Sequence, residues 1–390
     1  MKLPVITVLA GRDKRVRSGY PWVYSNEIQM DQNAKALPPG SVVKLQVEGG
    51  PVLGTAIFNP HTLIAARRLD KEVVAIDTAW FVARFKAALA VRERFYKEPY
   101  YRLVHAEADG LPGLIVDRYG DVLTVQANTA GMDKLLEAIV PALQQVTGAQ
   151  CVVLNRSGPA VQQEGLTEES RVLAGVLPAE VSIQENGIVY KVDPVNGQKT
   201  GWFYDQRENR AYLAQFAKGQ KVFDGYCYAG GFGMLSATKD AESVTFVDAS
   251  AAALELAKKS AEANGVASKC TFTKGDVMEV LASSPGTFGL MIVDPPAFIK
   301  NKKDMAAGLK GYRKLARLAA AATAPGGVLA ICTCSHHANL AEWSEEVARG
   351  IYEAGRSARL LRTSGAGPDH PVHPLLPESA YLKCQVFVLD

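Results

Sequence analysis

The chain has 390 residues, of which 48% are hydrophobic and 21% charged, and its formal net charge at pH 7 is +3. These values are typical of globular proteins and exclude a disordered or low-complexity chain. The length exceeds the usual size of one hydrophobic core, so we expect several domains. The net charge is too small to indicate a nucleic-acid partner by itself.

Cysteine spacing and hydropathy indicate where in the cell the protein is located and which kinds of site it contains. The six cysteines are scattered along the chain, which is typical of reduced thiols and not of a disulfide framework or a zinc site. The apolar run at the N-terminus is short and broken by Pro4, and no stretch long enough to cross a bilayer follows. We therefore expect a cytoplasmic protein with no metal and no membrane partner.

Residues 1–70 predict a small β-rich module. Strands are expected over 41–48, 51–59 and 63–70, because apolar and β-branched residues there are bounded by Gly, Pro and Asn turns. A second domain, of α+β class, is expected over residues 71–188.

In that second domain, apolar residues recur at helical spacing over 78–97, and Pro99 ends the pattern. A pair of hairpins is predicted over 103–126, followed by a helix over 132–148 and a strand over 151–157.

Residues 189–390 predict a Rossmann-like domain of α/β class. Strands and helices alternate there to the end of the chain, with a strand over 222–226, helices over 251–265 and 312–327, and a strand over 328–335. Such alternation predicts a mostly parallel sheet with helices on both faces. Ligands bind these sheets at the carboxyl ends of the strands.

Acidic residues lie at those predicted ends. Asp224 lies near the end of the first strand, Asp248 at the end of the second and Asp294 at the end of the fourth, while Asp276 follows the third. A carboxylate at the end of the second strand can accept hydrogen bonds from both ribose hydroxyls of an adenosine cofactor. The carboxylate of Asp276 suits a hydrogen bond from the adenine amino group of the same cofactor. A nicotinamide-dependent enzyme would share the ribose contact.

Turns beside these carboxylates favour a different cofactor from nicotinamide. At Gly230 and Gly231 the missing side chains let the backbone approach a cofactor beside a helix N-terminus. Pro295 and Pro296 fix a rigid turn that holds Asp294 toward the reactive end of the cofactor. A dehydrogenase has no evident use for this turn, so the combination favours S-adenosylmethionine.

The strand ending ICTCSHH contains the candidate nucleophile. A thiolate of Cys334 at the carboxyl end of the strand can attack an electron-poor pyrimidine carbon. Cys332, one pleat deeper, is interpreted as a core residue. His336 and His337 have open roles, in proton transfer or in capping the next helix.

Basic residues follow the proline turn directly, where they would line the mouth of the pocket and contact RNA phosphates. A solvated helix face is the alternative interpretation. The predicted RNA-binding residues are Lys300, Lys302, Lys303, Lys310, Arg313, Lys314 and Arg317.

Together the motifs HAEADGLPGLIVDRYGD, QKTGWFYDQRENR, DGYCYAGGFG, VDPPAF and TCSHH make the chain similar to the bacterial RNA cytosine-5 methyltransferases with an N-terminal PUA domain. The resemblance implies a PUA domain, a central domain of the EEHEAD type that contains residues 105–109, and a class I methyltransferase domain. Known members methylate a cytosine of large-subunit ribosomal RNA.

The resemblance also implies roles for residues. It places the nucleophile at Cys334 and the base-contacting carboxylate at Asp294. Glycines of the common methyltransferase signature are replaced by Tyr226 and Tyr228, and a second cysteine of related enzymes by Ala297, so the group that assists product release is unassigned. The cofactor-binding candidates are Asp224, Tyr228, Gly230, Gly231, Asp248, Asp276, Asp294 and Pro295.

The resulting hypothesis is a 5-methylcytosine methyltransferase that acts on large-subunit ribosomal RNA. Two alternatives stay open: methyl transfer to another base position without a covalent intermediate, and a non-catalytic RNA-binding assembly factor. The sequence does not identify the nucleotide, the proton acceptor at carbon 5, or whether the substrate is naked RNA or a ribosomal particle. A homodimer is a further option.

Overall fold

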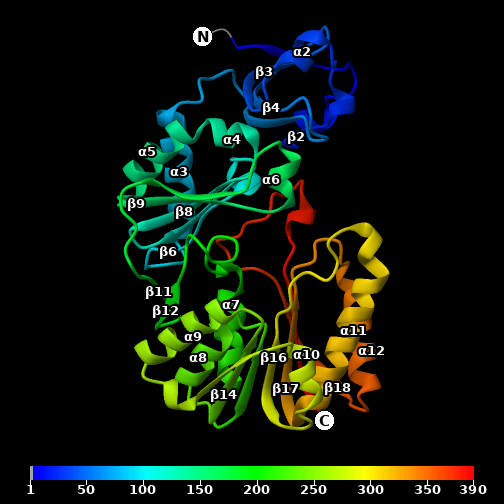
Figure 1. Ribbon diagram of the computed structural model, residues 1–390. Helices are drawn as coiled ribbons and strands as arrows, with labels where there is room; N and C mark the ends of the chain where they lie inside the picture. Colours follow the sequence, from blue (N-terminus) through cyan, green and yellow to red (C-terminus); the bar gives the residue numbers. More distant parts are fainter. Residues whose placement is uncertain (1–2) are drawn as a thin grey trace. The chain divides into compact units, whose positions relative to one another are not determined.

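The computed structural model describes residues 3–390, which form two compact units (Figure 1). The first unit comprises residues up to Val181 together with 193–202 and 368–377. The second comprises 182–192, 203–367 and 378–390. Two short segments that come after Val181 in the sequence therefore belong to the N-terminal unit.

The first unit contains two five-stranded sheets. In the N-terminal sheet the strand order is β1-β3-β4-β5-β2, and only the β1–β3 pair is parallel. Three of its strands match the predicted ones, whereas β2 has two residues, too few for a periodic pattern. Its elements are β1 (Val5–Val8), α1 (Lys14–Arg17), β2 (Trp22–Val23), α2 (Gln32–Ala36), β3 (Ser41–Val47), β4 (Val52–Phe58) and β5 (Ala66–Asp70).

The second sheet has the order β10-β9-β8-β7-β6 and includes the predicted pair of hairpins. Its first helix ends at Arg92, earlier than predicted, because the backbone tightens into i→i+3 turns before Pro99. The elements are α3 (Thr78–Arg92), β6 (Tyr100–His105), β7 (Leu114–Tyr119), β8 (Val122–Ala127), α4 (Ala130–Lys134), α5 (Leu136–Thr147), β9 (Cys151–Arg156), α6 (Pro159–Gln163) and β10 (Glu169–Ala174).

A seven-stranded sheet of order β15-β14-β13-β16-β17-β19-β18 forms the centre of the second unit. The five strands from β15 to β17 are parallel, as predicted, whereas β19 runs antiparallel to both of its neighbours, β17 and β18, and departs from the predicted alternation. The strands are β13 (Lys221–Gly225), β14 (Ser243–Asp248), β15 (Cys270–Lys274), β16 (Phe288–Val293), β17 (Thr323–Thr333), β18 (Ala358–Ser364) and β19 (Lys383–Leu389). A separate hairpin joins β11 (Val181–Glu185) to β12 (Ile188–Val192).

Helices cover both faces of this sheet, as Figure 1 shows. Phe246 packs against Gly230 and Gly233 at the start of α8, whereas the next residue, Val247, belongs to the core beneath α10, α11 and α12. Successive strand residues point to opposite faces, so these helices lie on different sides. The helices are α7 (Arg207–Leu213), α8 (Gly231–Thr238), α9 (Ala251–Ala263), α10 (Val277–Ala282), α11 (Met305–Ala322) and α12 (Leu340–Glu353).

Helix α11 begins at Met305, seven residues before the predicted start at 312. The glycines in this first part weaken the helical pattern in the sequence. Gly308 is nevertheless buried, and a Cβ there would lie 2.4 Å from Cγ1 of Ile299. Close packing, which the sequence pattern does not reveal, therefore stabilises these turns. No helix within residues 3–390 is long and apolar enough to span a membrane.

Candidate active site

The carboxyl edge of the parallel strands brings the predicted acidic residues together. Strand β13 lies between β14 and β16, so the residues that end these strands are neighbours. Asp224 and Asp248 lie within the last two residues of β13 and β14, and Asp294 directly follows β16. Electrostatic repulsion from Asp294 and Asp248 contributes to the raised pKa of Asp224, consistent with this proximity.

The loop after β13 keeps the backbone of a glycine-rich turn although it contains tyrosines. Tyr226, Tyr228 and Gly230 have φ angles of +60°, +48° and +81°. A non-glycine residue in this region costs on the order of 1–3 kcal/mol, so the surrounding structure must hold the loop. The backbone N–H of Tyr228 donates to Oδ2 of Asp248 (2.9 Å), and its ring packs edge-on against Phe203 at 5.3 Å.

Asp224 is buried inside this turn, with 1% of its surface exposed. Its Oδ2 accepts a 2.7 Å hydrogen bond from the N–H of Gly233, while Oδ1 has no partner within residues 3–390. Burial raises the pKa of Asp224 to about 7, the hydrogen bond opposes this, and Asp294 adds to it. A buried acceptor without a donor fits a ligand that carries hydroxyl or ammonium donors, as S-adenosylmethionine does.

The two other predicted cofactor carboxylates have structural partners as well. Asp248 accepts from the N–H of Ser250 (2.8 Å) in addition to that of Tyr228. Asp276 caps α10, because its Oδ1 accepts from the N–H groups of Met278 (2.8 Å) and Glu279 (3.1 Å). Each carboxylate retains acceptor capacity for ribose or adenine donors, since an ionised carboxylate has about four acceptor sites.

Gln206 is a site residue that sequence reasoning missed. Its Nε2 donates to Oδ2 of Asp294 (2.9 Å), and its Oε1 accepts from Nδ2 of Asn209 (2.7 Å). The residue lies in η3 (Tyr204–Gln206), far from Asp294 in sequence. The motif QKTGWFYDQRENR supported the resemblance, but no spacing in the sequence indicated this contact.

The two cysteines at the end of β17, Cys334 and Cys332, lie in different environments. Cys332 is fully buried and faces Cys384 across the β17–β19 pair. Cys334 comes directly after the end of β17 and is half-buried. Since β16 pairs with β17 and Val293 lies opposite Ile331, the Cys334 segment leaves the sheet at the same edge as Asp294.

A chain of buried hydroxyl groups connects the Cys334 segment to the proline turn. Oγ1 of Thr333 donates to the hydroxyl of Tyr312 (2.6 Å), which is 2.9 Å from Oγ of Ser335. The N–H groups of Phe298 and Ile299, which follow the turn, donate to Tyr312 and Ser335 (3.4 and 3.3 Å). Tyr312 of α11 therefore holds both segments that flank the candidate site.

The predicted RNA-binding residues are mostly exposed, along η6 (Lys302–Asp304) and α11. Arg313 is the exception, because its Nε lies 2.5 Å from Glu346 and a second nitrogen lies 3.5 Å from Glu353, both on α12. Arg313 therefore joins two helices, whereas the six other basic residues extend toward solvent.

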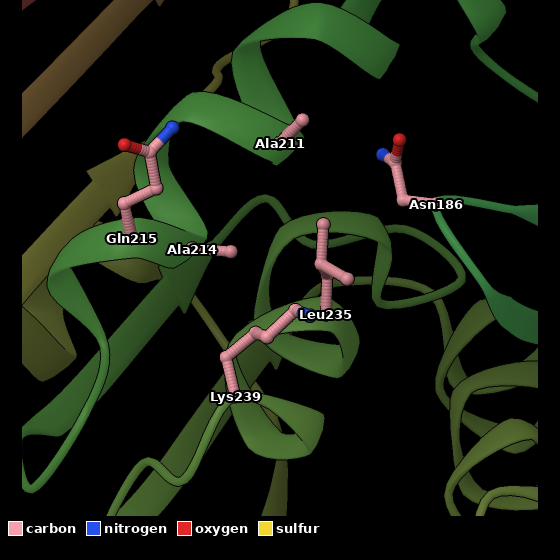
Figure 2. A pocket seen from close by; sticks show the side chains of 6 residues that line it. All are labelled: Asn186, Ala211, Ala214, Gln215, Leu235 and Lys239. Atoms are coloured by element: carbon pink, nitrogen blue, oxygen red, sulfur yellow. The ribbon is translucent and has the colours of Figure 1, made fainter.

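A cavity of about 430 Å³ lies elsewhere in the second unit (Figure 2). It is formed by α7, η4 (Ala214–Phe216), α8 and the β11–β12 turn, and none of the predicted site residues lines it. Its lining residues are Asn186, Ala211, Ala214, Gln215, Leu235 and Lys239.

The parallel sheet, the left-handed turn after β13 and the carboxylates at the strand ends define a Rossmann-like methyltransferase fold. The sequence model of the S-adenosylmethionine-dependent methyltransferases matches residues 102–371, and that of a PUA-like domain matches residues 6–71. The chain belongs to this methyltransferase family, and S-adenosylmethionine is its cofactor.

Relatives match along nearly the whole chain. A Pseudoalteromonas atlantica protein named ribosomal RNA large subunit methyltransferase I is 36% identical over 387 residues, 97% of each chain. Its Aeromonas hydrophila namesake is 35% identical, with the same coverage. A Streptococcus mutans structure assigned to the SAM-dependent methyltransferases covers 99% of this chain and 100% of that chain at 22% identity, with a TM-score of 0.81, which supports the fold.

Proposed function

We propose that the protein methylates carbon 5 of a cytosine in large-subunit ribosomal RNA, with Cys334 as the nucleophile. The names of the relatives support the substrate class. The observation that carries the chemistry is the half-buried thiol of Cys334 at the same sheet edge as Asp294. A nucleophile and a hydrogen-bonding carboxylate at one edge are the groups that covalent attack on a cytosine ring requires.

In this mechanism the sulfur of Cys334 forms a bond to carbon 6 of an unstacked cytosine, and Asp294 binds the ring-nitrogen edge. S-adenosylmethionine, when bound, supplies an electrophilic methyl group. Carbon 5 would accept that methyl group and would then lose its proton to a base that the sequence does not identify. The bond between carbon 6 and the sulfur breaks, which restores the thiolate and the aromatic ring.

The cofactor-binding residues proposed are Asp224, Tyr228, Gly230, Gly231, Asp248, Asp276, Asp294 and Pro295, which lie on and beside the carboxyl edge. The carboxylates would bind donors of the ribose, adenine and methionine parts, and the left-handed turn would bring its backbone close to the cofactor.

The proposal also includes the residues that bind RNA, the domain bounds and the location of the protein in the cell. The exposed lysines of η6 and α11 would contact phosphates, together with the PUA-like domain. We place the domains at residues 1–70, 71–188 and 189–390, and the protein in the cytoplasm, where ribosomal RNA would be its substrate. A homodimer stays a prediction.

Methyl transfer from labelled S-adenosylmethionine to protein-free ribosomal RNA and to purified large subunits tests the proposal. We expect 5-methylcytosine, mapped by mass spectrometry, from the wild type and none from Cys334→Ala. A label on another atom that survives this substitution would favour non-covalent methylation. RNA binding without any label would favour the assembly-factor alternative.

A further inference from the structure

Lys383 lies next to the candidate nucleophile on the neighbouring antiparallel strand. It is the first residue of β19 and pairs with Thr333, the last residue of β17. Its Nζ donates to the backbone oxygens of Ser335 (3.3 Å) and Tyr381 (3.2 Å). Because Ser335 directly follows Cys334, these hydrogen bonds hold the ammonium group beside the cysteine's own backbone.

The neighbours of Cys334 include the ammonium group of Lys383 and the phenol of Tyr312. Lys383 interacts electrostatically with Cys334, which opposes the lowering of the lysine pKa by burial. Tyr312 of α11 also faces Cys334, and burial raises the pKa of that phenol, so it stays neutral. Other titratable groups on the adjoining segments include Cys332, Cys384, Asp294, Tyr381 and the exposed His336 and His337.

We infer that Lys383 is a positioning residue whose ammonium group stabilises the thiolate form of Cys334. This inference rests on the proposed function, because it takes Cys334 as the nucleophile. The thiol would lose its proton to solvent before the substrate binds. A fixed ammonium group beside a thiol lowers its pKa, so a nucleophilic thiolate is present near neutral pH.

The test is the pH dependence of iodoacetamide alkylation in the full chain, followed for the Cys334 peptide by mass spectrometry. The wild-type midpoint is expected below the value of about 8.5 for a free thiol. Lys383→Met and Lys383→Gln should raise this midpoint by about one pH unit or more. Lys383→Arg, which keeps the charge, should raise it less.

Controls separate this effect from unfolding. The half-buried Cys270 serves as a reference thiol in the same samples, because burial raises its pKa to about 11. Its alkylation should be unchanged in the Lys383 variants if they fold. Lys218→Met, at an exposed position before β13, should leave the Cys334 midpoint unchanged.

A wild-type midpoint at or above the free-thiol value would overturn the inference, as would an unchanged midpoint in folded Lys383→Met. Methyl transfer assays on the same proteins distinguish the two proposals. Methylation that survives Cys334→Ala, together with a shifted midpoint in Lys383→Met, would leave the ion pair standing and reject the proposed mechanism. Loss of methylation in Cys334→Ala, together with an unchanged midpoint in Lys383→Met, would support the proposed mechanism and reject the role of Lys383.

Discussion

The side-chain amide of Gln206 lies 2.9 Å from Oδ2 of Asp294 and fixes the carboxylate that follows β16. Its orientation is set by Asn209, which donates to its oxygen and accepts a 2.7 Å hydrogen bond from Oγ of Ser364. Both Gln206 and Asn209 are nearly fully buried. Asp294 is therefore held by a network that passes through η3 and α7 and reaches Ser364 at the end of β18.

Replacing Gln206 with leucine should slow methyl transfer more than it weakens cofactor binding. The substitution keeps the side-chain volume and removes the hydrogen bond that orients Asp294. We expect kcat to fall on the order of tenfold, about 1.4 kcal/mol in activation free energy. Steady-state kinetics of methyl transfer, with the cofactor Kd from calorimetry, measure both quantities.

The matched control is Gln215→Leu, at an exposed position of η4 that lines the separate cavity described above. Its kcat should equal that of the wild type. Equal kcat values for Gln206→Leu and Gln215→Leu would show that the hydrogen bond to Asp294 does not matter for the reaction.

The parallel strands and the positions of Asp224, Asp248 and Asp294 could be predicted, because strand periodicity and parallel connections place strand ends at one edge. Gln206 could not, since its contact with Asp294 depends on the fold of a segment without periodic pattern. The antiparallel strands β18 and β19, and with them Lys383, were missed for a related reason. Strand β18 does follow a helix, α12, but β19 lies between β17 and β18 in the sheet. The segment before β19 contains only the short helix η7 (Pro377–Ser379), so no strand–helix alternation marks its place.

Gly233 is expected to tolerate no side chain. A Cβ at this position would lie 2.4 Å from Cε1 of Phe246 and 2.8 Å from Cγ1 of Val244, both on β14. Overpacking of this kind costs about 1–3 kcal/mol, which exceeds the gain in helix propensity from alanine, at most about 1 kcal/mol. Gly233→Ala should therefore lower the free energy of unfolding in urea titrations and weaken cofactor binding.

Gly275→Ala is the corresponding control near the same edge. A Cβ at Gly275 meets no heavy atom within 4 Å, and its φ is not in the left-handed region. Its stability should lie within about 0.5 kcal/mol of the wild type. If Gly233→Ala were as stable as Gly275→Ala, the prediction that α8 packs too closely against β14 for a side chain at Gly233 would be wrong.

Asp224 should make the protein less stable as the pH rises through the weakly acidic range. Its pKa is raised from 3.8 to about 7 by burial, so between these values the folded state binds more protons than the unfolded state. The free energy of unfolding then falls with increasing pH, by up to about 1.4 kcal/mol per unit from this group. Below about pH 4 and above about pH 7 the contribution is constant.

Asp224→Asn removes this titration and keeps an acceptor for the N–H of Gly233. The stability of the variant relative to the wild type should therefore increase from pH 4 to pH 7 and level off above. Urea unfolding of both proteins over this range measures the difference. A difference that does not change with pH would mean that Asp224 is ionised in the folded protein throughout.

Arg313 illustrates a limit of reading charge from sequence. It lies within the basic stretch 300–317, and its residue type gave no reason to separate it from Lys310 or Lys314. Only the packing of α11 against α12 reveals that Glu346 and Glu353 bind its guanidinium group. The sequence thus predicted where the positive charges lie, but not which of them are already paired.

The paired and unpaired charges should differ in their effect on RNA binding. Lys302 and Lys303 are exposed and beside the proline turn, so Lys302→Ala/Lys303→Ala should weaken RNA binding. It should also reduce the slope of log K against log salt concentration by about one for each phosphate that the two lysines neutralise in the wild type.

Arg313→Ala should leave that slope unchanged and lower the melting temperature, because it breaks the ion pairs between α11 and α12. The control Lys218→Ala/Lys221→Ala removes the same number of positive charges at the amino end of β13, opposite the carboxyl edge. Its salt-dependence slope should equal that of the wild type. Salt titrations that give all three variants one slope would mean that η6 does not contact RNA, and the phosphate-binding residues would then have to be sought in the PUA-like domain.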